Sequence, residues 1–210
     1  MSGPDWLRPL VDAVRVVRPE QLSRFLPPDD GSGRQSAVLM LFASPAGLAE
    51  ADVLLLERAS TLRSHPGQIA FPGGATDPGD RSATGTALRE ATEEVGLDPA
   101  TVDVLTELPA LFLPPSGFVV TPVLAHWRQP HPVGVVDIAE VASVHRVPLD
   151  QLLDPANRFT VRHPSGFIGP GFEVAGLFIW GFTAGLLARL LALAGWERPW
   201  DRDLERPVPL

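Results

Sequence analysis

Unbroken hydrophobic runs of strand length lie in the first third of the chain. Residues Ala37 to Ala43 form one such run and Val53 to Leu56 form another, and neither contains a charged side chain. Strands that are covered on both faces have runs of this kind, whereas half-exposed strands alternate apolar and polar residues. The pattern therefore predicts two buried strands. Further strands are predicted at residues 68–71, 102–105, 110–113, 118–124, 141–147 and 174–180.

Two other parts of the chain have the features of helices. Apolar residues recur at helical spacing between residues 5 and 25, which predicts one or two short helices interrupted near Pro19. Asp80 or Ser82 can cap a later helix that runs to about Val95, where Gly96 supplies the C-terminal stop. A short helix is also predicted at residues 148–153. Because strands and helices mix along the chain, we expect a layered α/β domain.

The predicted elements divide the chain into three parts. Residues 1–33 are an N-terminal helical segment followed by a turn-rich linker, and residues 34–196 form the main domain. Residues 197–210 are a charged, proline-containing tail, which is expected to be loosely held.

The uncharged stretch from Val174 to Ala188 raises the alternative of a membrane span. A span needs about 20 apolar residues, whereas this stretch contains three glycines and Thr183 and is followed by Arg189. We therefore predict a buried strand at residues 174–180, a turn at Gly181 and a helix that begins at Thr183, with no membrane association. Residues 1–9 lack the apolar core of a signal peptide.

The composition narrows the classes of function. The chain has 210 residues, of which 45% are hydrophobic and 20% are charged, and it has no cysteine. Disulfides, thiolate nucleophiles and cysteine-bound zinc are therefore excluded, and a reducing, cytoplasmic location is expected. The formal net charge is −8, and every basic residue other than histidine is an arginine. A chain with this charge is a poor general binder of nucleic acid, and a phosphate group would have to be gripped by arginine.

An acidic cluster in the second helix carries the candidate chemistry. Glu90, Glu93 and Glu94 fall within about 100° of one another around a helix. Carboxylates so close repel unless a cation lies among them, and Mg²⁺ or Mn²⁺ prefers oxygen ligands. Arg89 lies four residues before Glu93 and can hold it in place. The alternative is a solvated acidic face with a few arginine pairs.

The segment from Gly73 to Leu97 resembles the Nudix box, Gly-x5-Glu-x7-Arg-Glu-U-x-Glu-Glu-x-Gly-U with U apolar. Counted from Gly74, the loop acid is Asp80 instead of glutamate, and eight residues instead of seven separate it from Arg89. The role of Asp80 as an acid or base is therefore left open. The positions that match the box are Arg89, Glu90, Glu93, Glu94, Gly96 and Leu97.

The resemblance implies a fold and a set of roles. The implied fold is a Nudix-type α/β/α sandwich with a mixed sheet between helices. Glu90 and Glu94 would be the main ligands of Mg²⁺ or Mn²⁺, Glu93 would join or orient them, and a backbone carbonyl at Gly74 would contribute. With Arg89, these glutamates would form the catalytic group of a diphosphate hydrolase.

A second resemblance lies just upstream of the box. Leu54 to Gly74 is similar to a signature of the coenzyme A pyrophosphatase branch, Leu-Leu-Thr-x-Arg-[Ser/Ala]-x3-Arg-x3-Gly-x3-Phe-Pro-Gly-Gly, with Leu56 in place of the threonine. The segments 113–118, 120–123, 147–155 and 179–184 are also similar to this branch. The resemblance implies a coenzyme A or acyl-coenzyme A substrate. The implied substrate-binding residues are Arg58, Arg63, Gly67 and Phe71.

Several alternatives stay open at this point. Glu140 is a candidate distal metal ligand or general base, or else a surface loop residue; relatives often have a second acid nearby, where this chain has Ser143. The substrate could be another nucleoside diphosphate derivative, such as NADH or ADP-ribose. The domain could also bind a nucleotide without catalysis, or be a plain interaction module. The oligomeric state is also open, and a homodimer is one possibility.

Overall fold

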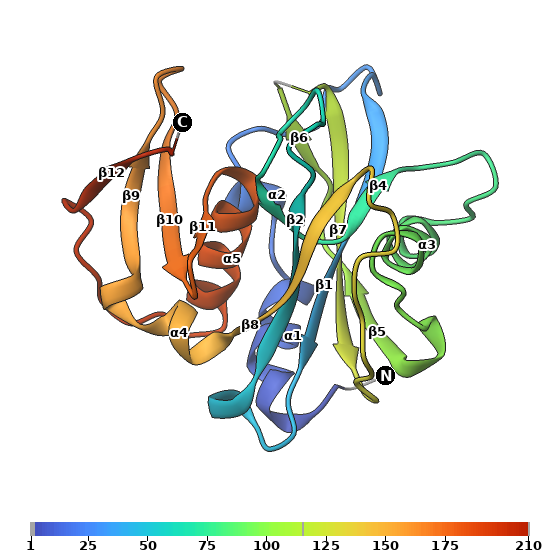
Figure 1. Ribbon diagram of the computed structural model, residues 1–210, viewed down its shortest axis with the longest axis horizontal. Coiled ribbons are helices and arrows are strands. Elements are labelled where there is room, and N and C mark those ends of the chain that lie inside the picture. Colours follow the sequence, from blue (N-terminus) through green and yellow to red (C-terminus); the bar gives the residue numbers. More distant parts are fainter. Residues whose placement is uncertain (1–2, 115, 210) are drawn as a thin grey trace.

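The chain folds into two β-sheets that are covered by helices (Figure 1). The computed structural model describes residues 3–114 and 116–209; Pro115, in one segment that resembles the coenzyme A branch, and Leu210, in the tail, lie outside them. Among the described residues the larger sheet has eight strands, with β4 pairing β1, β6 pairing β7 and β8 pairing β2 beside the path β3-β2-β1-β7-β5. These strands are β1 (Arg34–Ala43), β2 (Asp52–Arg58), β3 (Ile69–Ala70), β4 (Gly73–Ala75), β5 (Val102–Glu107), β6 (Leu111–Leu113), β7 (Phe118–Trp127) and β8 (Val141–Pro148).

The larger sheet is mixed, as the sequence predicted. β1 runs parallel to β7, with Arg34 opposite Phe118 and Phe42 opposite His126, whereas the other pairs in this sheet are antiparallel. β1 pairs with β2 only at residues 42–43 and with β4 at residues 36–38. β1 and β2 therefore separate along their length, and the β3–β4 segment fills the space between them. This separation brings the paired glycines of β4 to the middle of the sheet.

Helices cover both faces of this sheet (Figure 1). Helix α3 (Ala83–Val95) lies on one face, and α1 (Arg8–Arg15) and α5 (Gly181–Leu193) lie on the other. The α/β/α sandwich predicted from the sequence is therefore confirmed. The remaining helices are α2 (Pro19–Leu22), α4 (Leu149–Leu153) and the short 3-10 helices η1 (Asp5–Leu7), η2 (Leu48–Glu50), η3 (Pro99–Thr101) and η4 (Pro155–Asn157).

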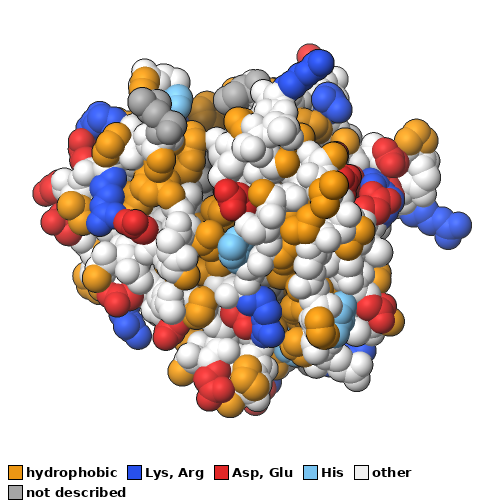
Figure 2. Space-filling view, in the orientation of Figure 1, with side chains coloured by type: hydrophobic (Ala, Val, Ile, Leu, Met, Phe, Trp, Pro, Cys, Tyr) orange, Lys and Arg blue, Asp and Glu red, His pale blue; other side chains and the backbone are white. Residues whose placement is uncertain are grey.

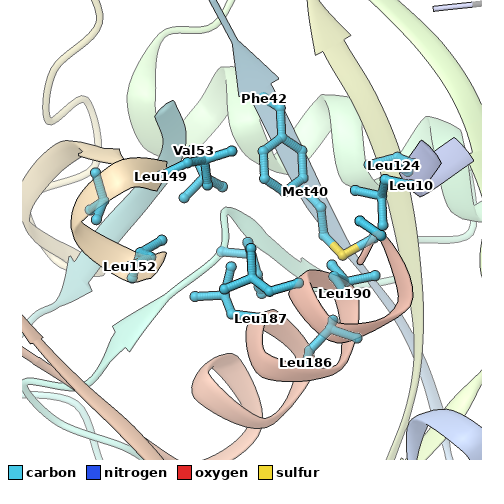
Figure 3. Close-up of a cluster of buried hydrophobic side chains, with 14 of the residues drawn as sticks. Leu10, Met40, Phe42, Val53, Leu124, Leu149, Leu152, Leu186, Leu187 and Leu190 are labelled. Atoms are coloured by element: carbon cyan, nitrogen blue, oxygen red, sulfur yellow. The ribbon is translucent and has the colours of Figure 1, made fainter. Parts of the chain in front are cut away.

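The unbroken apolar run of β1 is explained by burial on both faces. Met40 and Phe42 pack on the side of α5, while Leu39 and Leu41 pack on the side of α3. Figure 3 shows the first of these two cores, where Met40 and Phe42 lie among leucines of α4 and α5 and Leu10 of α1. The N-terminal helices are thus part of the main core.

A second, smaller sheet was not predicted. It has the order β11-β10-β9-β12, and β12 runs parallel to β9. Figure 2 shows hydrophobic side chains reaching the surface along the boundary between the two sheets. The strands of the smaller sheet are β9 (Arg158–Arg162), β10 (Ile168–Val174), β11 (Leu177–Ile179) and β12 (Glu205–Pro207).

The single strand predicted at residues 174–180 is wrong. Ala175 and Gly176 both have positive φ, of 53° and 80°, and turn the chain between β10 and β11. Helix α5 begins at Gly181, two residues before the predicted start at Thr183. The other predicted strands are observed with their ends within three residues of the predicted ones. Within residues 3–114 and 116–209, the helices are too short or too polar to cross a membrane.

The C-terminal tail is held, contrary to the prediction. Arg158 of β9 has a fully buried side chain, and its Nη1 donates to Oε1 of Glu197 at 2.8 Å. Its guanidinium lies between the rings of Phe172 and Trp200, 4.8 and 4.6 Å from their centroids. Cation–π contacts of this kind stabilise a desolvated arginine. The buried arginine therefore fastens the segment that leads to β12.

Candidate functional site

Helix α3 presents its acidic residues because its two ends are fixed. Oγ of Ser82 accepts a hydrogen bond from the backbone N–H of Gly85 at 3.1 Å, and Gly96 ends the helix in the left-handed conformation at φ 72°. Both are standard caps, and both agree with the prediction. Ala87, Ala91 and Val95 are fully buried against the sheet.

Arg89 links the loop before α3 to the helix. Its Nη2 donates to Ala75 O at 2.9 Å and to Glu90 Oε1 at 2.9 Å, and its Nη1 donates to Glu93 Oε2 at 2.8 Å. Its Nε and Nη2 also donate to the two carboxylate oxygens of Asp80, at 3.1 and 3.0 Å. The hydrogen bond to Asp80 is the main cause of the raised pKa of Arg89, so its guanidinium stays charged. Nη2 carries two hydrogens and faces three acceptors, so one of its hydrogens is shared between two of them.

Asp80 is a partner of Arg89. The hydrogen bond from Arg89 and one from the backbone of Asp77 lower the pKa of Asp80 well below its usual range. The hydroxyl of Thr86 also donates to Oδ2 of Asp80, at 2.9 Å. A carboxylate held ionised in this way does not exchange protons near neutral pH. The geometry therefore supports a positioning role for Asp80 and not the acid or base role left open above.

Glu94 and Glu90 form a buried pair of carboxyl groups. Glu94 is only 3% exposed, and its Oε2 accepts a hydrogen bond from the backbone N–H of Gly73 at 2.9 Å. Burial raises the pKa of Glu94 to about 8, with Glu90 and Glu140 adding to the effect and Gly73 and Arg58 opposing it. Burial also raises the pKa of Glu90, against the influence of Arg89.

Two glycines allow the loop to approach these carboxyl groups. A Cβ atom on Gly74 would lie 2.6 Å from the carboxyl group of Glu90, and one on Gly73 would lie 2.3 Å from the carbonyl oxygen of Ala37. Gly73 also has a φ of 155°. A side chain at Gly74 would push the loop away from α3 and one at Gly73 would push it away from β1, so both glycines are required by close packing.

The buried pair fits a hard divalent cation. Glu90 and Glu94 offer only oxygen atoms, and a cation would offset the cost of burying two carboxylates. Among the described residues no three acidic or histidine side chains converge at metal-ligand spacing. Mg²⁺ is commonly held by one or two carboxylates together with waters and substrate phosphates, which matches a two-glutamate site. Glu93 lies apart from the pair, with a side chain 58% exposed.

The upstream loop places one arginine beside the pair. Nε of Arg58 is buried and has no hydrogen-bond partner among the described residues, and its charge lowers the pKa that burial raises at Glu94. The N–H of Gly67 donates to Arg58 O at 3.0 Å, which closes the loop, and Arg63 in between is exposed. Phe71 is only 3% exposed and packs in the core. Phe71 therefore packs under the loop, and its contact with substrate stays a prediction.

Glu140 lies close enough to act on the pair electrostatically. Its exposed carboxylate raises the pKa of both Glu90 and Glu94, after burial as the main cause. Its backbone carbonyl accepts a hydrogen bond from Ala59 N at 2.8 Å, so its position is tied to the arginine loop. Arg58 thus lies within electrostatic range of Glu94, and Glu140 lies within electrostatic range of both Glu90 and Glu94. Thr86 was not anticipated, because nothing in the sequence distinguishes a threonine that binds a loop acid from any other helical threonine.

Comparisons with known proteins identify the family of this chain. The sequence profile described as "NUDIX domain" matches residues 33–165. A protein named "Uncharacterized Nudix hydrolase NudL" from Cronobacter sakazakii (strain ATCC BAA-894) is 40% identical over 205 residues, which cover 94% of this chain and 99% of that one. The protein of the same name from Escherichia coli (strain K12) is 36% identical over 169 residues, covering 77% and 83%. The crystal structure of the Nudix hydrolase RenU from M. smegmatis has a similar fold, with a TM-score of 0.51, 24% identity and coverage of 77% and 86%.

Proposed function

Because the chain belongs to the Nudix hydrolase family, we propose that it hydrolyses the diphosphate bond of coenzyme A or an acyl-coenzyme A. The products are 3′,5′-ADP and phosphopantetheine or its acyl derivative. The observation that carries this proposal is the buried Nε of Arg58, which has no partner in the described structure and lies beside the acid pair. A buried donor without a partner is costly, and a substrate phosphate oxygen would satisfy it.

The separate phosphates of coenzyme A suit the two arginines of the loop. Arg58 lies within electrostatic range of Glu94 and would bind the diphosphate, whereas Arg63 is exposed and would bind the 3′-phosphate. Arginine grips phosphate with two parallel hydrogen bonds. Because the chain has no lysine, the guanidinium groups of these two arginines are the expected ligands of phosphate. Gly67 closes the loop that carries them.

The buried acids would hold Mg²⁺ or Mn²⁺. Glu90 and Glu94 would ligate the cation, and Gly74 would add a backbone oxygen. When bound, such an ion neutralises charge on a diphosphate and lowers the pKa of water. Arg89 keeps Glu90 in place through its Nη2, and the N–H of Gly73 keeps Glu94 in place. Glu93 orients Arg89 from the solvent side.

Glu140 is the proposed general base of this site. It is exposed and therefore open to water, and it lies within electrostatic range of both buried acids. Asp80 is less suited because its hydrogen bond with Arg89 lowers its pKa and so makes it a weak proton acceptor. A base must be able to take up a proton from the attacking water and release it to solvent.

The nearest alternative is another nucleoside diphosphate derivative, such as NADH or ADP-ribose. The same buried acids would serve either reaction, so the arginine loop is what favours coenzyme A. Binding without catalysis is disfavoured, because all three glutamates of the helix are present. The cysteine-free composition supports a reducing, cytoplasmic setting for a small-molecule substrate.

A substrate panel tests the proposal. The full chain is incubated with Mn²⁺ or Mg²⁺ and with coenzyme A, acetyl-coenzyme A, dephospho-coenzyme A, NADH or ADP-ribose, and the products are identified by mass. We expect 3′,5′-ADP from the first two at the highest kcat/KM. Arg63→Ala should lower kcat/KM about tenfold for coenzyme A but less for dephospho-coenzyme A, which lacks the 3′-phosphate. Equal losses for the two substrates, or none, would remove the assignment of Arg63 to the 3′-phosphate.

A further inference from the structure

A chain of three polar side chains crosses from β8 to β2. Oγ of Ser143 donates to Oε2 of Glu57 at 2.8 Å, and Nε2 of His145 lies 2.6 Å from the same Oγ. Serine has one hydroxyl proton, and a carboxylate only accepts, so that proton goes to Glu57. His145 must then donate its Nε2–H to the serine. The order of donation is therefore His145 to Ser143 to Glu57.

This polar chain lies on the face of the sheet that turns away from α3. His145 is opposite Leu55 in the ladder, and Leu55 packs in the core on the side of α5. Ser143 lies two residues before His145 on β8, and Glu57 lies two residues after Leu55 on β2. Ser143 and Glu57 are opposite each other and lie on the same face as His145 and Leu55. The chain is therefore separate from the buried acids, which lie on the α3 side.

A β-bulge follows this pair directly. The β2–β8 ladder is regular from Asp52 opposite Pro148 to Glu57 opposite Ser143, and the next pair joins Arg58 to Val141. One residue of β8, Ala142, is skipped. Val141 consequently turns into the core on the α3 side, where it is 1% exposed. Bulges re-aim the side chains that follow them and are frequent beside functional sites.

The residues beyond the bulge lie within electrostatic range of the acid pair. Arg58 lies on β2 with its buried, unpartnered Nε, and Glu140 lies just before Val141 on the other strand. The N–H of Ala59 donates to the carbonyl of Glu140 at 2.8 Å, so the two strand ends move together. Whatever fixes the last regular pair before the bulge therefore fixes Arg58 and Glu140 at once.

We propose that Ser143 is a positioning residue: its hydrogen bond to Glu57 holds the bulge that sets Arg58 and Glu140 beside Glu90 and Glu94. His145 keeps the serine hydroxyl turned toward Glu57. Ser143 acts through other residues and does not touch the substrate. The effect on turnover rests on the function proposed above, whereas the effect on the placement of Arg58 does not.

The test compares a variant that lacks the hydroxyl group at position 143 with one that keeps it. Ser143→Ala removes the donor, Ser143→Thr keeps it, and Ser44→Ala removes a hydroxyl that bonds Gly47 O in the remote β1–β2 connection. The first readout is the Nε–H resonance of Arg58 in ¹⁵N spectra of the full chain, assigned by its loss in Arg58→Lys. We expect this resonance to shift in Ser143→Ala, to return in Ser143→Thr and to be unchanged in Ser44→Ala.

The second readout is turnover of the substrate found in the panel. We expect kcat/KM to fall about tenfold in Ser143→Ala, as for other residues that orient a catalytic group, and to recover in Ser143→Thr. Glu57→Leu removes the same hydrogen bond from its other end and should have the same effect, which keeps the test decisive if Ser143→Ala does not fold. The double variant should be no worse than either single one, because both remove one interaction.

The outcomes separate this inference from the proposed function. An unchanged Arg58 resonance in Ser143→Ala and Glu57→Leu, or additive losses in the double variant, would overturn the positioning role. If no diphosphate compound is cleaved by the unmodified chain, the proposed function fails, but the resonance of Arg58 still decides whether Ser143 positions it.

Discussion

Asp80 and Arg89 form a two-point hydrogen-bonded pair even though the sequence between them is one residue longer than the Nudix pattern allows. The side chain of Asp80 is 8% exposed and that of Arg89 is 24% exposed, so the pair is largely shielded from water. The contact spans from the loop before α3 to the second half of that helix. The pair therefore joins the glycine loop to the acidic helix.

Asp80→Asn should lower kcat/KM about tenfold, because the neutral amide cannot hold Arg89 against Glu90 as the carboxylate does. The matched control is Asp77→Ala. Asp77 lies 3.7 Å from Arg89 with a side chain 65% exposed, and exposed ion pairs contribute little. Steady-state kinetics on both variants check this; equal losses would show that the loop as a whole, and not Asp80, supports Arg89.

Glu94→Gln should lower turnover by at least about 100-fold and weaken the binding of Mn²⁺, because the substitution keeps the shape and removes the charge of a proposed ligand. Glu93→Gln should stay within about tenfold, since among the described residues the carboxylate of Glu93 is hydrogen-bonded to Arg89 alone. Calorimetric titration with Mn²⁺ measures the affinity of each variant for the metal independently of catalysis. Undiminished activity in Glu94→Gln would rule out Glu94 as a metal ligand.

Gly74→Ala should impair the site by steric displacement, because the new Cβ would lie 2.6 Å from the carboxyl group of Glu90. We expect a loss of kcat/KM of about tenfold or more. Gly79→Ala is the control, since a Cβ there would meet no atom within 4 Å and its φ is not positive. If both alanine variants retain full activity, close packing of Gly74 against Glu90 is not needed for catalysis.

Glu197→Ala should lower the free energy of unfolding by about 3 kcal/mol, because it leaves the buried charge of Arg158 without its partner. Burial lowers the pKa of Arg158 and Glu197 opposes that effect. Glu205→Ala removes an ion pair with Arg162 in which both side chains are about half exposed, and should cost less than about 1 kcal/mol. Urea-induced unfolding compares the two. A smaller loss in Glu197→Ala than in Glu205→Ala would contradict the buried pairing.

His126 should make the free energy of unfolding fall as the pH drops below about 6.5, the usual pKa of a histidine in an unfolded chain. Burial lowers the pKa of His126, with Arg128 adding to the effect and Asp103 opposing it. The unfolded chain therefore binds a proton at a higher pH than the folded chain, so the stabilisation is complete above the unfolded pKa and is lost as the pH falls from there through the lower folded pKa. The loss of unfolding free energy on acidification should be smaller in His126→Gln. An identical pH dependence in both proteins would exclude His126 as its source.

The parts of the fold that followed from sequence were those set by local chemistry. β1 and β2 were predictable because both faces are buried, and α3 was predictable because Ser82 and Gly96 cap it. The β10–β11 turn was missed because Ala175 adopts positive φ, which alanine rarely does. β12 was missed because three residues that include a proline gain their structure only from pairing with distant β9.

The candidate site was predictable in its residue types but not in its geometry. Helical spacing placed Glu90, Glu93 and Glu94 on one face, yet the contact of Glu94 with Gly73 and of Glu93 with Arg89 separates their environments. The pairing of Asp80 with Arg89 depends on the path of a loop, which spacing alone does not determine. The bulge beside Arg58 depends on the register of two strands far apart in sequence.

The burial of β1 on both faces has a consequence for the protein outside its folded state. The segment from Ala37 to Ala43 has high strand propensity, no charge and no proline, which are the features of segments that aggregate. In the folded chain its edges are occupied by β7 on one side and by β4 and β2 on the other. Once unfolded, the same edges are open to other chains. Recovery after denaturation should therefore fall steeply with protein concentration, and Arg34, at the start of β1, is the nearest charge that can oppose such association.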